Sequence, residues 1–416
     1  MVRDLLRKLS DERLFFSVFF VFVFDLPFSE AIKEVSLVLS FLLIILRLSE
    51  DAFSMAGRIL LLGLPVLLFA AGSLLSALHS INRVQAMHGF WGDFEALMAW
   101  VVFSGAFLLF FDRARTLRIT LLALAGGILA GGLVGLYKMV ALADPNMELM
   151  NLGDKNSSAQ FLSMAFLLFL GAGTLGREAG LSWKLVGPLL VLTGGLLVLC
   201  HSRSFLVSVP VASMALLIFC RKWRALAVVG VAMLMAGGAF ALSPHLRWEM
   251  TTVIHPSQDG SFVSRYATWQ GAMRIYHDHP FLGVGPDTFH MANIHRLYHL
   301  PDYASHGHNL FFNLLGEYGL LGVLLFSLIL LAWVARVLRE KENSATVRFL
   351  KGMTVAFVLN LLLAGLAHPM WGGSPSLIFM LVMALVLVME DEVSLRHRLS
   401  GRPEHSVPVF GQRHLH

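Results

Sequence analysis

Long apolar runs dominate this chain and are separated by short polar segments. The runs lie at 14–28, 31–48, 59–78, 91–111, 117–143, 158–176, 184–200, 204–220, 225–243, 319–338, 349–367 and 375–390. An α-helix of about 20 apolar residues crosses the hydrocarbon core of a bilayer, which is about 30 Å thick. The pattern therefore predicts an all-α integral membrane protein with about 12 transmembrane helices, whose boundaries are set to within about 2–4 residues.

One long polar stretch, from Pro244 to Asn309, interrupts this pattern. It holds nine of the 17 histidines and has aromatic residues throughout. Loops longer than about 12–15 residues are usually functional or disordered, and the aromatic content favours a packed cap over a site. The chain thus divides into helices 1–9 at 1–243, the large loop at 244–309, helices 10–12 at 310–390 and a tail at 391–416. Residues 309–318 are expected to form a helical lead-in to the tenth span.

Composition supports this class. The chain is 56% hydrophobic and 14% charged, whereas charged residues make up about a quarter of a soluble protein. The net charge of +5 does not indicate a nucleic-acid partner, because most basic residues flank the apolar runs. Cys200 and Cys220 lie within apolar runs and form neither a disulfide framework nor a metal signature.

Basic residues orient the predicted bundle. Cytoplasmic loops of membrane proteins carry an excess of lysine and arginine. With a cytoplasmic N-terminus, all but nine of the 32 such residues fall on the inner side. The nine that lie outside or near the outer boundary are Lys33, Arg83, Lys138, Lys155, Arg203, Arg247, Arg265, Arg274 and Arg296. This asymmetry predicts that both termini are cytoplasmic and that the large loop faces outward.

Two outer arginines are candidates for an anion site. Arg203 lies in a polar junction between two spans, and Arg265 lies on an apparent helix with Trp269. Either could simply reach to the membrane surface, which is common for arginine near a span end. The planar guanidinium also matches the oxygens of a phosphate group, and two arginines on one face beside a cap strengthen that interpretation.

His306 and His308 end the polar stretch and flank Gly307. A neutral imidazole can act as a general base near physiological pH. The pair could instead be a polar helix start with Asn309 as the cap. We predict no metal site, because outer carboxylates are few and no His-Glu-x-x-His motif occurs. Residues two apart at a helix start should point in different directions.

The remaining outer polar residues allow structural and functional interpretations. Asp154 is expected to cap the sixth span, with Lys155 as a weaker candidate for ligand contact. Ten residues separate Arg274 from Gly285, an Arg-x10-Gly spacing that is weak evidence by itself. Arg274 is therefore a weaker candidate for substrate binding. A transporter is disfavoured because the spans are expected to hold almost no charges near the membrane centre, Lys138 being the nearest.

Several motifs together resemble the bacterial O-antigen ligase superfamily. They are His279-Pro280-x-x-Gly283-x-Gly285-Pro286, His308-Asn309, Glu317-x-Gly319-x-x-Gly322 and the upstream Ser202-Arg203-Ser204. The layout of about 12 spans with one late outward loop is similar too. The specific motifs are confined to about residues 200–322. The superfamily includes O-antigen ligases, O-antigen polymerases and protein O-oligosaccharyltransferases.

The resemblance implies a metal-independent inverting glycosyl transfer that needs no cofactor. O-antigen glycan would pass from undecaprenyl pyrophosphate to a lipid A-core sugar on the periplasmic face of the bacterial inner membrane. By position, the family's arginines match Arg203 and Arg265, and its histidine matches His308. His306, Arg274, Lys155 and Asn309 are weaker candidates for substrate contact. The partners implied are the lipid-linked donor, the lipid A-core acceptor and membrane lipid.

Alternatives remain from two other classes. A related polymerase or protein glycosyltransferase would share most of this pattern. The single large outer loop favours a ligase, since polymerases of the superfamily often have two arginine-rich outer loops. The other alternative is a non-enzymatic transporter or lipid-binding membrane protein, although no inverted pair of broken helices is evident.

Overall fold

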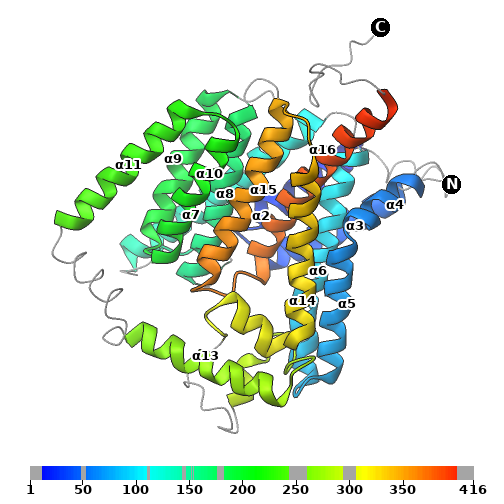
Figure 1. The fold of residues 1–416 in the computed structure, drawn as a ribbon, viewed down its shortest axis with the longest axis vertical. Helices are drawn as coiled ribbons and strands as arrows, with labels where there is room; N and C mark the ends of the chain where they lie inside the picture. The colour runs from blue at the N-terminus through cyan, green and yellow to red at the C-terminus, as the bar shows by residue number, and fades with distance from the viewer. Residues whose placement is uncertain are drawn as a thin grey trace.

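A computed structural model describes residues 12–47, 53–109, 113–142, 147–150, 152, 154–175, 182–242, 260–293 and 306–400. The described part of the chain is helical and contains no strand (Figure 1). Its helices are α2 (Glu12–Asp25), α3 (Glu30–Arg47), α4 (Phe53–Leu62), α5 (Leu64–His79), α6 (Arg83–Leu109), α7 (Arg113–Ala141), α8 (Lys155–Leu175), α9 (Trp183–Leu199), α10 (Arg203–Phe219), α11 (Trp223–Leu242), α13 (Gly260–Asp278), η4 (Phe289–Asn293), α14 (Leu310–Arg339), α15 (Ala345–Gly365) and α16 (Gly373–Ser400).

Each predicted span overlaps one of these helices, or the α4–α5 pair, so the all-helical class is confirmed for the described residues. Six helices are long and apolar enough to cross a membrane: α6, α7, α8, α14, α15 and α16. The α4–α5 pair, bent by 63°, gives a seventh if it forms one span. Helices α9 and α10 are apolar but have only 17 residues each. The chain is a multi-pass membrane protein, and the count of about 12 spans stays a prediction.

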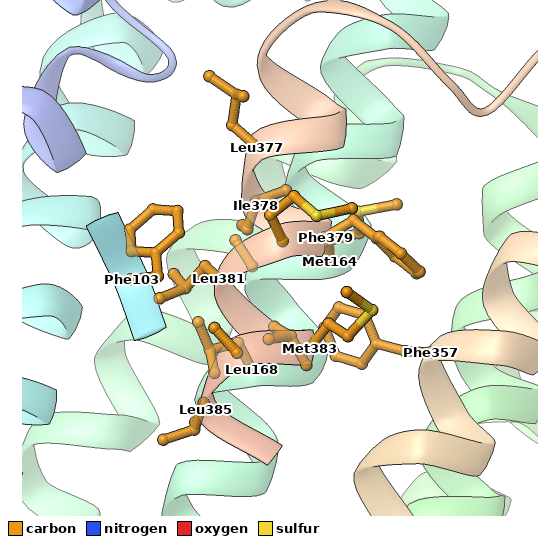
Figure 2. Packing of buried hydrophobic residues seen from close by; sticks show 14 of the residues in the cluster. Phe103, Met164, Leu168, Phe357, Leu377, Ile378, Phe379, Leu381, Met383 and Leu385 are labelled. Atoms are coloured by element: carbon orange, nitrogen blue, oxygen red, sulfur yellow. The ribbon is translucent and has the colours of Figure 1, made fainter. Parts of the chain in front are cut away.

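The core of the bundle forms around α16. Its apolar face is buried against α6, α8 and α15, and Figure 2 shows Phe379 and Met383 of α16 among these neighbours. Phe103 of α6, Met164 of α8 and Phe357 of α15 are each 1% exposed or less. Apolar residues cover α16 on nearly all sides, as expected for a helix in the middle of a membrane bundle.

Charged groups separate toward the two ends of the bundle. At one end, Arg336 of α14 pairs with Glu390 and Asp391 of α16, and Arg58 of α4 also pairs with Asp391. The predicted cytoplasmic residue Arg115 packs over Phe16. The histidines 306, 308 and 368 lie at the other ends of α14 and α16, where α13 crosses the bundle (Figure 1). The direction in which the bundle crosses the membrane stays a prediction.

The described part of the large loop packs against the bundle. Helix α13 lies across one end of the bundle (Figure 1) and contacts the start of α14. A small core of its own joins Ala272 and Ile275 of α13 to Val284 and Phe289, with Phe312 of α14 against it. Trp269 stacks on Phe312 with ring centres 5.4 Å apart. Residues 260–293 therefore form a packed cap, as predicted, whereas residues 244–259 and 294–305 lie outside the described part of the chain.

Helix α14 is kinked at Gly319, where the backbone angles are non-helical (φ 63°, ψ −159°). A kink removes the hydrogen bonds that residues just after it would make with the preceding turn. Here the N–H groups of Leu320 and Leu321 donate instead to the carbonyls of Pro280 and Phe281, at 2.8 and 3.1 Å. Residues 310–318 form the helical lead-in that the sequence predicted.

The same loop also satisfies the carbonyls left free before the kink. The N–H of Val284 donates to the carbonyl of Gly316 at 3.0 Å, and that of Gly285 donates to Glu317 at 2.9 Å. The segment from His279 to Pro286 is therefore a backbone clasp around the kink. This explains why glycines follow His279-Pro280 at these positions, and it fixes the lead-in that carries His308-Asn309.

Two buried carboxylates lie within a predicted span, and sequence reasoning did not single them out. Asp93 and Glu95 lie inside α6, and each is 4% exposed. Ser73, Tyr318 and Trp371 all donate hydrogen bonds to the Asp93 carboxylate, the last at 2.7 Å. Glu95 pairs with Lys33 of α3 at 3.2 Å. Buried charges persist in a membrane protein when they are hydrogen-bonded or paired in this way.

Candidate functional site

His306 and His308 lie together just before α14. Their ring centres are 4.2 Å apart at an interplanar angle of 64°. The expectation that they point in different directions was wrong, because both precede the helix and His308 has a positive φ of 47° that folds the chain back. Asn309 is the N-cap of α14 and accepts hydrogen bonds from the N–H groups of Phe311 and Phe312.

The backbone around the two histidines is held by side chains. The N–H of Gly307 donates to the amide oxygen of Asn313 at 2.8 Å. The N–H of His308 donates to Nδ1 of His306 at 3.1 Å. Since Nδ1 of His306 accepts, its neutral ring carries the proton on Nε2. His306 can therefore donate a hydrogen bond through Nε2. The same backbone hydrogen bond does not involve the ring of His308, so it leaves the tautomer of His308 open.

A third histidine joins this pair, and sequence reasoning did not single it out. His368 lies between α15 and α16, is 5% exposed, and has its ring centre 5.8 Å from that of His306. Phe205 of α10 contacts its other side at 6.3 Å. The available signal was its place beside Pro369 in the outer junction between the last two predicted spans. That signal gives the membrane face but not the distance to His306.

All three imidazoles are neutral at pH 7. Burial and, to a smaller extent, the nearby His368 lower the pKa of His306 to about 4. Burial and the neighbouring His306 lower the pKa of His308 to about 4 as well. Burial also lowers the pKa of His368 to about 4, while the Asp154 carboxylate opposes this shift. A neutral imidazole has a free lone pair and can accept a proton.

The two arginines that the sequence singled out lie at this end of the bundle. The positive charge of Arg265, on α13, contributes to the lowered pKa of His306, His308 and His368. Arg203 is the first residue of α10, two residues before Phe205, which contacts His368. The structure therefore brings Arg203, Arg265 and His308 to one region from three separate parts of the chain.

The weaker candidates have different surroundings. Asp154 caps α8, as predicted, by accepting from the N–H groups of Asn156 and Ser157, and Lys155 begins that helix. Asn309 caps α14 and also donates to the carbonyl of Leu366 at 3.0 Å. Both ends of its amide group are thus used in holding the site's backbone.

Arg274 lies on α13 and does not line the cavity beside the histidines. It is nine residues beyond Arg265 on α13, which places it about 13.5 Å farther along the helix axis. It lines a groove with Tyr266, Trp269 and Phe312.

Two cavities distinguish the ends of the bundle. A cavity of about 230 Å³ is lined by His306 and His368 together with Asp154 and Trp371. A larger one of about 610 Å³ lies at the opposite end, beside Arg336 and Glu390. The smaller cavity is the one next to the histidines and Arg265, so size alone does not identify the site.

Comparison with known proteins agrees with the motifs. Residues 188–327, about a third of the chain, match the family model described as O-antigen ligase. This match supports the resemblance to the O-antigen ligase superfamily that the motifs indicate. Arg203, Arg265 and His308 lie within the matched segment, whereas Lys155 and His368 lie outside it. A search of the curated proteins found no match.

Proposed function

We propose that this member of the O-antigen ligase superfamily is a membrane glycosyltransferase that acts as an O-antigen ligase. It would transfer O-antigen glycan from undecaprenyl pyrophosphate to a hydroxyl group of a lipid A-core sugar. The observation that carries the proposal is the neutral His306–His308 pair beside Arg265, at the start of the kinked α14 and within the matched segment. Uncharged imidazole and a fixed cation are the two groups that such a transfer needs.

The chemistry follows from these groups. The acceptor oxygen attacks the anomeric carbon from the face opposite the pyrophosphate, so a new C–O bond forms and the bond to the phosphate oxygen breaks with inversion. The leaving pyrophosphate gains negative charge, which Arg203 and Arg265 stabilise most strongly in a partly dry site. The acceptor proton passes to His308 as the attack proceeds. His306 donates through Nε2 to a substrate oxygen.

We infer that no metal ion takes part. Among the described residues, the carboxylates of Glu30, Glu34 and Glu95 lie close enough together to hold a metal ion. Two of these carboxylates, Glu30 and Glu95, are already paired with Lys33. The three histidines do not belong to this group. Two arginines would supply the positive charge that a divalent ion provides in other transferases.

The site would face the periplasm, with both termini in the cytoplasm of a bacterium and the chain in its inner membrane. The arginines 58, 115 and 336 lie at the end opposite the histidines, and that end would be cytoplasmic by the excess of basic residues. A lipid-linked donor reaches such a site from the membrane while its glycan stays in water.

A transfer assay with the purified full-length chain tests the proposal. Undecaprenyl-pyrophosphate-linked glycan is supplied with lipid A-core, and product is followed by a mobility shift of the lipopolysaccharide, with and without EDTA. We expect transfer that EDTA does not reduce. If glycan is added only to another lipid-linked glycan, the chain is a polymerase. If glycan is added only to a protein, the chain is a protein glycosyltransferase. If EDTA stops the reaction and a divalent ion restores it, metal independence is wrong.

A further inference from the structure

The cavity beside the histidines is built by four separate parts of the chain. Its volume is about 230 Å³. Glu30 begins α3, Asp154 and Gln160 lie at the start of α8, and His306 precedes α14. The fourth part runs from His368, in the α15–α16 connection, to Pro375 at the start of α16. Pockets for drug-sized ligands start near about 300 Å³, so this one has room for about a single sugar unit.

Its lining favours a sugar over a phosphate. Glu30 and Asp154 contribute carboxylates, and no lysine or arginine appears among its described lining residues. Lys33 lies behind Glu30, is fully buried, and is shared with Glu95. A pyrophosphate group would be repelled by this lining, whereas sugar hydroxyl groups can donate to it. The donor's charged group therefore belongs with the arginines rather than in this cavity.

His368 is placed to contact a ligand in this cavity. It is 5% exposed and lines the cavity wall. Its ring lies against those of Phe205 and His306. A neutral imidazole has one nitrogen that donates and one that accepts, so a sugar hydroxyl group in the cavity could donate to His368.

The cavity wall is also held rigidly in place. Trp371 lines it, and the indole N–H of Trp371 donates to Asp93 of α6 at 2.7 Å. Asp93 also accepts from Tyr318, which directly precedes the kink at Gly319. A site held by such contacts binds with less loss of conformational freedom than a loop that orders on binding.

We propose that this cavity binds the sugar of the acceptor, and that His368 accepts a hydrogen bond from one of its hydroxyl groups. This inference rests on the proposed transferase function. His306 lines the cavity and its ring contacts His308, so a sugar held there has a hydroxyl group next to the base. The donor would approach from the side of Arg203 and Arg265. His368 is neutral at pH 7 and so has the lone pair that this contact requires.

Steady-state kinetics of the purified full-length chain give the first test. His368→Ala should raise the KM for lipid A-core about 3- to 10-fold, the range for loss of one hydrogen bond, while the KM for the lipid-linked donor stays unchanged. His368→Gln should recover part of this loss, because its amide oxygen can accept. His277→Ala is the matched control, since the His277 side chain is 89% exposed. An increase in the donor KM alone, or no change in either, would overturn the proposal.

Protection from alkylation gives a second test that does not depend on turnover. Leu152 lines the cavity, so Leu152→Cys is made in a Cys200→Ala, Cys220→Ala background. Core oligosaccharide without its lipid should slow alkylation of this cysteine when no donor is present. The same protection should occur when Arg203→Ala is added, although that variant should not transfer.

The two tests separate the subsite from the transferase. If core oligosaccharide protects but no transfer is found, the sugar subsite stands and the proposed reaction fails. If transfer proceeds but core oligosaccharide gives no protection, the subsite is wrong. Protection by the lipid-linked donor alone would assign the cavity to the donor and overturn the proposal.

Discussion

Gly283 and Gly319 pack backbone against backbone where the loop clasps α14. A Cβ atom on Gly319 would lie 2.7 Å from the backbone nitrogen of Gly283, and one on Gly283 would lie 2.4 Å from the carbonyl carbon of Glu317. Both glycines also have positive φ, at 65° and 63°. The clasp thus depends on the absence of side chains at these two positions, and it sets the direction in which the lead-in presents His308.

Alanine at either glycine should weaken this clasp. A backbone conformation with positive φ alone costs about 1–3 kcal/mol for a residue with a Cβ, and the backbone clash adds to it. We expect Gly283→Ala and Gly319→Ala to lower the apparent Tm in detergent, measured by differential scanning fluorimetry, and to reduce transfer. Gly230→Ala is the control, because Gly230 lies in α11 with open space around it. A Tm equal to that of the control would show that the close approach is not needed for stability.

Much of the fold could be predicted from apolar periodicity, while the packing of the site could not. Span lengths and basic residues indicated the helices and the two ends of the bundle. The residues before the tenth span also indicated the helical lead-in, and the N-cap preference of aspartate indicated the Asp154 cap. Whether His306 and His308 touch depends on the positive φ of His308, which no local pattern reveals. His368 is 60 residues beyond His308, and only the packing of α15 and α16 brings it there.

The charges inside α6 were missed for a related reason. Asp93 and Glu95 lie near the start of an apolar run, where an acidic residue suggests a span boundary rather than a buried partner. Their partners come from distant parts of the chain: Glu95 pairs with Lys33 of α3, and Asp93 accepts a hydrogen bond from Tyr318 of α14. A single sequence does not show which distant donors meet a buried carboxylate, so their role had to come from the structure.

The two arginines should both be required for transfer. Arg203→Ala and Arg265→Ala should each lower kcat by about 10²–10³-fold, as when one fixed donor to a developing anion is removed. Lysine at either position should restore little, since it lacks the planar fork of donors. Arg118→Ala is the control, because this exposed arginine lies on α7 near the opposite end. Transfer at the normal rate in either alanine variant would remove that arginine from the mechanism.

The orientation can be tested with two cysteines introduced at described, exposed positions. His277→Cys lies on α13, and Lys341→Cys lies between α14 and α15 at the opposite end of the bundle. In the background without native cysteines, an impermeant thiol reagent should label position 277 in intact spheroplasts and should reach position 341 only after lysis. Labelling of 341 without 277 in intact cells would reverse the orientation and move the site to the cytoplasm.

The pH dependence should reflect the lowered pKa of His308. A base must be unprotonated, and the pKa of about 4 keeps His308 neutral throughout the range above pH 5. The acid limb of kcat/KM, which reports the free enzyme, should therefore lie near pH 4 rather than near about 6.5, the usual histidine pKa.

Donor binding should move the acid limb upward. The negative pyrophosphate favours the imidazolium form, so it raises the pKa of His308, and the limb of kcat should lie at higher pH than that of kcat/KM. Both profiles come from initial rates measured from about pH 3 to about pH 8, so that they extend to either side of the expected limb. If kcat fell at lower pH than kcat/KM, the group that titrates would not lie beside the pyrophosphate.

The last prediction distinguishes the two adjacent histidines. Nδ1 of His306 accepts from the backbone N–H of His308, so its neutral ring has a proton on Nε2 and no lone pair there. His306 is suited to donate a hydrogen bond to substrate. The ring of His308 takes no part in this hydrogen bond, so either of its nitrogens can carry the lone pair that takes the acceptor's proton. His308 also directly precedes the Asn309 cap, which fixes it relative to α14. A catalytic base tolerates little displacement from its working position.

We therefore expect His308→Ala to lower kcat by about 10²–10⁴-fold, the usual contribution of general-base catalysis, while donor binding is retained. His306→Ala should cost far less, and His306→Gln less still, because an amide N–H can replace the Nε2 donor. Single-turnover rates with preloaded donor separate the chemical step from binding, and His277→Ala serves again as the control. A large loss at His306 with normal turnover at His308 would exchange their roles. Small, equal losses at both would mean that water removes the proton and that the arginines carry the catalysis.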